Sequence, residues 1–390
     1  MDKVEVSVLR AICAVCVALV ISTEAISQNS VKPLSVKIDQ VIADNYPNMR
    51  AYALVQAGNG TMVTNLAPSL FSARIDGMDV KAKATIVPRT MIDFPTDYTI
   101  VISNNGIMDG EPLDFQKSAI LQFVELMKDK DTLSVYTIGE DATPVFEKQK
   151  KDAIDTALIN AIAVSAVQPR VYDSVINVLR KVEQRKTERK IVIVISDGRD
   201  QNSRFTKEQM YTVLADAGIP IYAIGIRVLS AQSLSNLDEM ADKTGGTYVY
   251  SRSLSAIPGN LKYLFDCINN CYIITYRIKN VKADDLPHHL EITVRDRDAA
   301  GAGQKAFIAV KVPVPLWLKI IICVIIFIVL IVIIVLLIIH KIQVRKRMGI
   351  TRRRCPVCHR LMKDTWDNCP FCKYLPSTKG DNDDNDKRRK

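Results

Sequence analysis

A long apolar segment near the C-terminus constrains this 390-residue chain more than any other feature. It runs from Leu316 to Ile339, and residues 320–339 contain no charged residue, glycine or proline. A helix of that length rises about 30 Å, the thickness of the hydrocarbon core of a bilayer. The core helix of a soluble protein would have a polar side, which this segment lacks. We therefore expect residues 316–339 to form a single transmembrane helix, with Trp317 at the membrane interface.

The N-terminus has the three-part pattern of a secretory signal peptide. Lys3 and Arg10 precede an apolar run at residues 11–21, and Ala25-Ile26-Ser27 resembles a cleavage site. We therefore expect residues 1–27 to direct export and to be removed. An uncleaved anchor is the alternative, although the apolar run is short for a membrane span.

Almost all of the net charge of +10 lies after the apolar segment. Residues 340–390 contain 15 Lys and Arg but 6 Asp and Glu, a net +9 that leaves +1 for the rest. Segment 340–354 is basic and contains no acid, so the positive-inside rule predicts a cytoplasmic C-terminus and an exported N-terminal part in the cell membrane. We expect this juxtamembrane segment to contact lipid headgroups. Nucleic-acid binding by the exported part is not expected.

Short strand-like runs with turn signals lie at both ends of the exported part. The first group precedes residue 97, and the second follows Cys271. Their spacing is typical of a β-sandwich. We expect a β-rich segment at 28–96 and further strands at 268–315, and we hypothesise that the two segments pair. The expected strands are 49–56, 61–64, 71–75, 272–278, 290–294 and 306–312.

Between these segments, strands alternate with amphipathic helices. Lys190–Ser196 is nearly all β-branched, as is typical of a strand buried on both faces. Alternation of this kind predicts an α/β fold with a doubly wound, mostly parallel sheet. The expected strands are 98–103, 132–138, 190–196, 221–226 and 248–250. The expected helices are 115–128, 151–164, 171–184, 206–217, 233–243 and 257–265.

Several local motifs occur in one order along this region. They are residues 103–110 (SNNGIMDG), 171–174 (VYDS), 195–198 (ISDG), 224–226 (IGI) and 244–248 (TGGTY). With these motifs, residues 97–267 resemble the von Willebrand factor A family, and the flanking strands look like those of bacterial exported members. The resemblance implies a domain that binds a protein partner through loops at the carboxyl ends of its strands.

The family's binding chemistry is a metal-ion-dependent adhesion site. A first loop supplies Asp-x-Ser-x-Ser, a second a Thr and a third an Asp, because a hard divalent cation takes oxygen ligands. At the matching positions this chain has Ser103, Asn105, Ile107, Pro169 and Asp197. This is a degenerate adhesion site, so we expect no tight Mg²⁺ binding. Asp197 has an alternative interpretation as a turn former before Gly198.

Two further functional hypotheses remain open at this point. A metal-dependent adhesin would use nearby acids, such as Asp109 or Asp200, as substitute ligands. An envelope enzyme is less favoured, because the exported part has only His288 and His289 as histidines. It also has no Gly-x-Ser-x-Gly elbow and no phosphate-binding glycine loop. We therefore expect a non-catalytic interaction protein of the adhesion or scaffold type.

Cysteines predict one metal site and leave one pairing open. Cys355, Cys358, Cys369 and Cys372 form two Cys-x2-Cys pairs, a spacing that resembles a zinc ribbon at 355–372 with a closed, structural Zn²⁺. The glycine usual after each pair is replaced by His359 and Lys373. Residues 373–390 are expected to be a disordered tail. Cys267 and Cys271 form either a disulfide or two free thiols.

Overall fold

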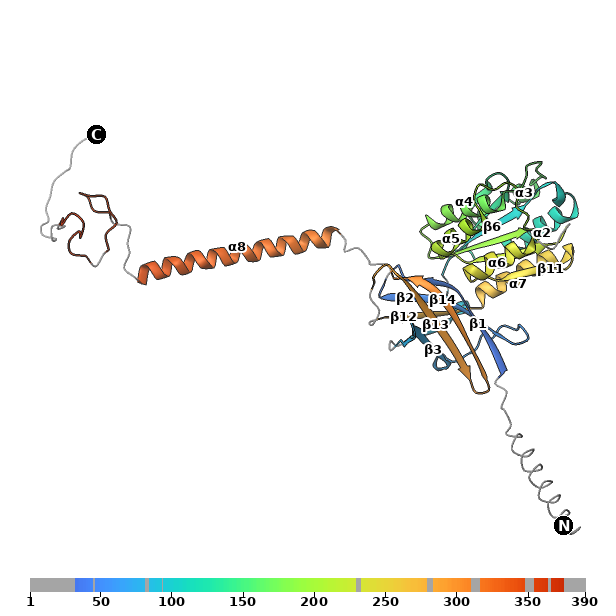
Figure 1. Cartoon of the computed structure of the whole chain (residues 1–390), viewed down its shortest axis with the longest axis horizontal. Helices are drawn as coiled ribbons and strands as arrows, with labels where there is room; N and C mark the ends of the chain where they lie inside the picture. The colour runs from blue at the N-terminus through green and yellow to red at the C-terminus, as the bar shows by residue number, and fades with distance from the viewer. Residues whose placement is uncertain are drawn as a thin grey trace, which may run out of the picture. The chain divides into compact units, whose positions relative to one another are not determined.

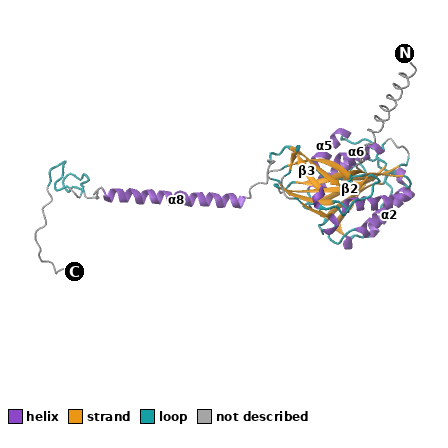
Figure 2. Cartoon of the chain, turned by 90° about the horizontal axis from the view of Figure 1, so that it is seen from below, coloured by secondary structure: helices purple, strands orange, loops and turns teal. Residues whose placement is uncertain are grey.

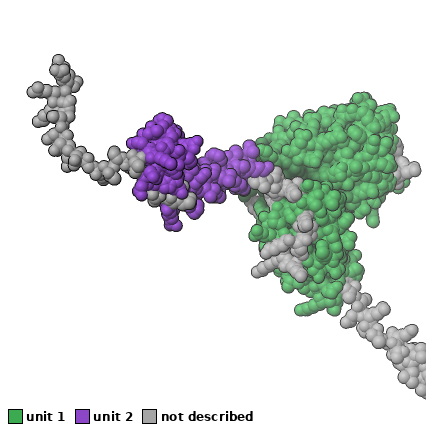
Figure 3. All heavy atoms as spheres, turned by 60° about the vertical axis from the view of Figure 1, so that its left-hand side comes forward, with its two compact units in different colours: residues 1–312 green, residues 313–390 purple. Residues whose placement is uncertain are grey.

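The computed structural model (Figure 1) describes residues 32–44, 46–80, 84–92, 94–228, 233–278, 283–309, 316–347, 354–363 and 366–374. The chain divides into two compact units, Met1–Val312 and Pro313–Lys390 (Figure 3). The expected signal peptide and the tail from residue 375 lie outside the described residues.

A six-stranded sheet forms the centre of the α/β domain. Five strands run parallel, and the edge strand β8 runs antiparallel to β7. The middle strands are buried at every residue except Lys190 of β9, as their apolar sequences predict. The spatial order is β11 (Tyr248–Ser251), β10 (Ile221–Ile226), β9 (Arg189–Ser196), β6 (Thr96–Ser103), β7 (Thr132–Ile138) and β8 (Thr143–Lys150).

Helices cover both faces of this sheet (Figures 1 and 2). On β9, Ile191 and Ile193 pack with the first helix group and Val192 and Val194 with the second, because alternate side chains of a strand point to opposite faces. The predicted doubly wound α/β fold is therefore confirmed. The first group is α2 (Glu111–Leu126) and α7 (Ile257–Asn269). The second is α4 (Val171–Glu183), α5 (Lys207–Ala217) and α6 (Leu234–Thr244).

Two local predictions are wrong. The region expected to be a helix at 151–164 contains a 3-10 turn, Lys151–Ala153, and the short α3, Thr156–Asn160. The Asp155 side chain starts α3 by accepting a hydrogen bond from Ala157 N, but the helix ends after five residues. The expected strand at 61–64 is reduced to a single bridge between Gln56 and Met62.

A second sheet combines strands from before and after the α/β domain. Strand β12 lies between β2 and β5, β13 pairs with β3, and β14 pairs with β1, so the two flanking segments share one sheet. The spatial order is β4 (Met78–Asp79), β3 (Phe71–Ile75), β13 (Pro287–Asp296), β14 (Ala299–Ile308), β1 (Lys32–Ile42), β2 (Asn48–Ala57), β12 (Tyr272–Arg277) and β5 (Thr85–Pro88).

Glycines allow β14 to approach β1 closely. A Cβ at Gly301 would lie 2.1 Å from Leu34 O, and one at Gly303 would lie 2.2 Å from Val36 O. Since no side chain fits at those distances, these positions of β14 require glycine. Behind the contact, the apolar faces of β1, β2, β12 and β13 pack into one core.

A buried ion pair joins the two sheets. Arg189 on β9 is 1% exposed, and its guanidinium donates to both carboxylate oxygens of Asp39 on β1. Tyr222 on β10 donates to the same carboxylate at 2.7 Å, and the Tyr52 ring lies 4.0 Å from the guanidinium carbon. A buried pair with these additional contacts fixes relative position, because removing either charge would leave the other unpaired in the interior.

The second unit contains one long apolar helix and the cysteine-rich segment. Helix α8 spans Leu316–Arg347, and its most apolar window has a mean hydropathy of 4.1. By length and composition this helix is able to cross a membrane.

Candidate functional sites

Three loops at the carboxyl ends of the parallel strands form the first candidate site. We call them the rim: residues 103–112, 168–174 and 197–204. Strands β6 and β9 are paired in register, which places Ser103 beside Ser196, and the two hydroxyl oxygens lie 2.7 Å apart. Gly198 has a φ of +71°, and a Cβ there would lie 2.3 Å from Ser233 O, so the turn requires glycine.

Asp197 already has a cation beside it. Its side chain is 2% exposed, and Oδ2 accepts a hydrogen bond from Arg199 Nε at 2.6 Å. The backbone N–H of Arg199 donates to Oδ1 at 3.3 Å. The Arg199 side chain is 26% exposed, and no hydrogen bond from its two terminal amino groups is present within the described residues. Sequence analysis missed Arg199, although a basic residue two positions after the Asp is a visible signal.

The other adhesion-site positions have structural roles. The Asn105 side-chain oxygen accepts from Ile107 N at 3.2 Å and caps the 3-10 turn Gly106–Met108. Ile107 packs against the core on the α2 face of the sheet. Pro169 is buried, and its carbonyl accepts from Gln201 N at 2.8 Å, which links the second loop to the third.

The two acids considered as substitute ligands differ in accessibility. Asp109 is exposed, and its Oδ1 accepts from Gly110 N at 3.0 Å. The Asp200 carboxylate accepts more hydrogen bonds than that of Asp109: its Oδ1 accepts from Tyr172 N at 3.1 Å and from Ser203 Oγ at 2.6 Å. The Asp200 carboxylate therefore fastens the third loop to the start of α4.

Asp173 is a second internal anchor of the rim. Its side chain is 0% exposed and accepts from the N–H groups of Arg204 and Phe205 and from Arg204 Nε. Burial by itself raises the pKa of Asp173, but these donors and the Arg204 charge outweigh it and hold the pKa below its usual value. The rim is thus held together by its own acid–cation pairs.

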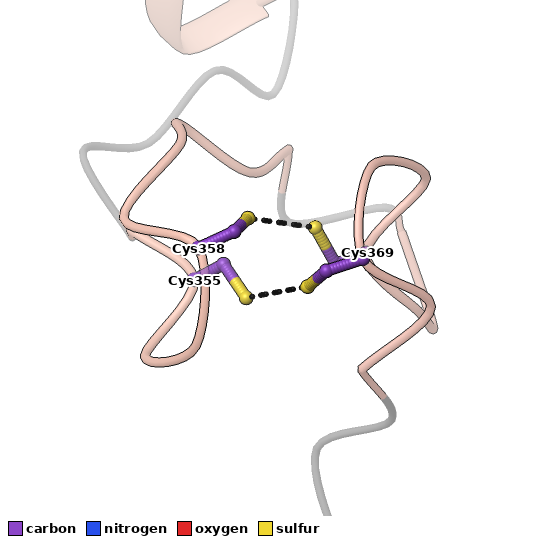
Figure 4. A group of neighbouring side chains, drawn as sticks. Cys355, Cys358 and Cys369 are labelled. Carbon is purple, nitrogen blue, oxygen red and sulfur yellow. Dashed lines mark hydrogen bonds between the residues drawn. The ribbon is translucent and has the colours of Figure 1, made fainter.

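The second candidate site is the cysteine cluster (Figure 4). Sulfur atoms of Cys355 and Cys372 lie 3.4 Å apart, and those of Cys358 and Cys369 lie 3.6 Å apart. All four sulfurs lie within 4.8 Å of one another. Four thiolates about 2.3 Å from a tetrahedral zinc would be about 3.8 Å apart. The four cysteines therefore fit a metal ion.

Each cysteine pair forms a similar turn. His359 N donates to Cys355 O at 2.8 Å, and Lys373 N donates to Cys369 O at 2.8 Å. His359 has a φ of +53° and Lys373 a φ of +57°, the left-handed conformation that glycine adopts most easily. The absence of glycine after each pair therefore leaves the turn geometry intact.

Backbone donors favour the thiolate form of the first cysteine in each turn, whereas burial and hydrogen bonds with neighbouring thiols raise the pKa of Cys372 to about 12. Burial alone raises the pKa values of Cys355 and Cys369, but N–H groups of the following turn residues donate to both sulfurs. The result is a lowered pKa for both, that of Cys369 reaching about 6. Since the thiolate is the metal ligand, the turns are suited to holding a cation.

Cys267 and Cys271 are free thiols in the structure, and a disulfide between them stays a prediction. Cys267 lies in the last turns of α7, whereas Cys271 immediately precedes β12 and donates to Ile268 O at 3.2 Å. Burial raises the pKa of Cys267 to about 11 and that of Cys271 to about 12. Both thiols therefore behave as small core residues.

The fold and the rim define an α/β binding domain of a known class. A family model of the von Willebrand factor type A domain matches residues 97–262. The chain therefore contains a von Willebrand factor type A domain, and such domains mostly mediate protein interaction. No curated protein matches the chain.

Three solved structures illustrate the structural similarity. A von Willebrand factor type A protein from Catenulispora acidiphila is 11% identical, with 72% of this chain and 75% of that chain covered and a TM-score of 0.40. BatB from Bacteroides thetaiotaomicron is 15% identical, with 44% and 98% covered and a TM-score of 0.36. Proximal thread matrix protein 1 from the mussel byssus, with a zinc-occupied MIDAS motif, is 20% identical, with 51% and 50% covered and a TM-score of 0.40.

Proposed function

We propose that this chain is a non-catalytic, membrane-anchored interaction protein whose rim binds a protein partner without a bridging metal ion. The observation that carries the proposal is the contact of Arg199 Nε with the buried Asp197 carboxylate at 2.6 Å. In a metal-dependent site, the carboxylate at this position contributes to holding a divalent cation. Here its charge is already balanced within the protein.

The remaining donors support the same proposal. Ile107 offers no side-chain oxygen, and the Asn105 oxygen is used as a cap. Mg²⁺ requires a nearly regular octahedron of oxygens, so the loss of these ligands strongly weakens binding. A metal-dependent adhesin remains the second candidate, because Asp109 is exposed and has few contacts to break.

The proposed organisation follows the sequence pattern. Segment 1–27 is the export signal, and residues 28–96, 97–267 and 268–315 form the exported part. Residues 316–339 cross the membrane once, the basic segment 340–354 contacts lipid headgroups, and the C-terminus lies in the cytoplasm. Residues 355–372 hold a structural Zn²⁺. The charge pattern and the sulfur geometry support these assignments.

Photo-crosslinking in the native membrane tests the metal-independent contact. A crosslinking amino acid replaces Gln201, an exposed rim residue whose backbone N–H, not its side chain, makes the contact with Pro169 O. The matched control is Lys150, an exposed residue at the end of β8 that pairs with Thr132, at the sheet edge opposite the rim. We expect the Gln201 variant alone to capture a partner, equally in EDTA and in Mg²⁺. Capture that needs Mg²⁺ would favour the adhesin instead.

A further inference from the structure

An aromatic–cation cluster lies on the surface of the cysteine-rich segment. It consists of Arg360, Lys363, Trp366 and Phe371. The Phe371 ring is 55% exposed, and its centroid lies 4.7 Å from the Arg360 guanidinium carbon and 6.4 Å from the Trp366 ring. The Lys363 ammonium lies 5.7 Å from the Trp366 ring.

These side chains are not needed to form a core. The segment is too short for one, and four sulfurs already bring its two turns together. Leu361 and Val357 are also exposed, at 55% and 61%. Exposed apolar side chains gathered on so small a fold indicate a contact surface.

The short connection between α8 and the cysteine-rich segment limits which partners the aromatic–cation cluster can reach. From Arg347, the last residue of α8, to Arg354 there are seven peptide steps, which reach at most about 25 Å in any conformation. If α8 crosses a membrane, the cluster is therefore confined to the neighbourhood of that membrane's surface.

Charge favours the membrane over other occupants. Residues 340–374 contain ten Lys and Arg and two Asp and Glu. Basic residues close to a bilayer are attracted to anionic headgroups, and aromatic rings beside Arg and Lys are typical of side chains at the interface. Arg360 and Lys363 lie against the very rings that would enter the headgroup layer.

We propose that the aromatic–cation cluster docks the cysteine-rich segment onto the anionic surface of the membrane that α8 crosses. The proposal rests on the membrane span proposed above. In the docked state the rings of Phe371 and Trp366 lie at the level of the headgroups, and Arg360 and Lys363 pair with lipid phosphates. The metal site then holds the two turns in the arrangement that presents the cluster.

Tryptophan fluorescence tests the docking directly, because the chain has only two tryptophans. The full chain carrying Trp317→Phe reports on Trp366 alone. It is reconstituted in nanodiscs of phosphatidylcholine, with or without phosphatidylglycerol, and with brominated acyl chains as quenchers. We expect Trp366 emission to shift to the blue and to be quenched in the anionic discs, and both effects to weaken at high salt. Equal emission in both kinds of disc overturns the proposal.

Matched variants identify the surface. Phe371→Ser and the pair Arg360→Glu with Lys363→Glu should abolish the quenching, whereas Phe371→Leu should retain it. Zinc content, measured in each variant, should not change, since the cysteines are intact. Quenching that survives Phe371→Ser and the charge reversals contradicts the docking, as does a blue shift that depends on protein concentration, because the latter indicates a second copy of the chain.

A second single-tryptophan chain separates this proposal from the span itself. Trp366→Phe leaves Trp317, at the start of α8, as the reporter. If Trp317 is quenched and Trp366 is not, the docking fails and the span stands. If neither is quenched, the span has failed.

Discussion

The rim and the cysteine cluster differ in how the negative charge of their acidic groups is balanced. Both bring groups of negative charge together from separate loops. At the rim, each buried carboxylate has an arginine of the same chain beside it, Arg199 for Asp197 and Arg204 for Asp173. In the cysteine cluster, four sulfurs converge, and the donors that lower the pKa of Cys369 are backbone N–H groups and neighbouring thiols.

This difference indicates which site depends on a metal. A carboxylate with its own guanidinium gains little from an added cation, because binding would first have to break the pair. Four thiolates would repel one another without a cation, so we expect the fold of this segment to be coupled to metal binding. Two clusters of acidic groups can thus be distinguished by whether a basic side chain of the same chain lies beside each acidic group.

The largest expected effect is on the cysteine cluster. We expect Cys358→Ser to weaken zinc binding by more than about 100-fold, since even outer contacts of a metal site are worth about 10–100-fold. Protease resistance of residues 354–374 should be lost with the metal. Zinc retention is measured after dialysis of the purified chain, with Cys323→Ser in α8 as the matched control. Full retention by Cys358→Ser would contradict a four-sulfur site.

The rim should instead depend on its arginine. Arg199→Ala leaves the buried Asp197 carboxylate without its charged donor, which we expect to lower the free energy of unfolding by about 2 kcal/mol. Denaturant unfolding of the solubilised chain, followed by circular dichroism, measures this loss. Replacing Asp197 by Asn in the same chain should restore part of it. A loss no larger than that of the surface variant Lys150→Ala would show that the pair is dispensable.

Acid should loosen the rim through Asp173. Its pKa is lower in the folded chain than in the unfolded one, so its contribution is complete above about pH 4, the unfolded pKa. That contribution is lost as the pH falls through the folded pKa. We expect Asp173→Asn to cost about 1.5 kcal/mol at pH 7 and progressively less in acid. Unfolding at several pH values measures the difference, and a cost independent of pH would argue against the charge.

The smallest expected effect is that of Mg²⁺ on the rim. With a dissociation constant in the millimolar range or weaker, 1 mM Mg²⁺ would stabilise the domain by no more than about 0.4 kcal/mol. The effect should be larger in Arg199→Ala, where the Asp197 carboxylate is released. Calorimetric titration checks both statements. Micromolar affinity in the unmodified chain would remove the contrast between the two sites.

Sequence patterns predicted the doubly wound sheet well, because its central strands are apolar runs, of which residues 191–195 are entirely β-branched. They failed at β8, whose residues 143–150 include Pro144, Glu147, Lys148 and Lys150. A half-exposed edge strand needs no apolar alternation, so it leaves a weak signal. The prediction of one helix at 151–164 was also wrong, since this region forms a 3-10 turn and the five-residue α3.

The candidate sites show the same limit. Local spacing alone predicted the four-cysteine site, since two residues separate the cysteines of each pair. The contact between Arg199 and Asp197 depends on a side-chain conformation, and the anchoring of Asp173 depends on a loop about thirty residues away. The order of residues shows Arg199 two positions after Asp197, but it predicts neither of these two contacts.

The buried ion pair between the two sheets has a mechanical consequence. The chain enters the α/β domain after β5 and leaves it at β12, and these two strands pair with each other. The Arg189–Asp39 ion pair adds a non-covalent connection between the domain and the second sheet. The two chain connections, the buried pair and further contacts such as that of Lys305 Nζ with Thr244 O should together restrict rotation of the domain relative to the second sheet. A force applied at the rim would therefore reach the second sheet through β5 and β12 together, two strands hydrogen-bonded to each other, and not through one linker.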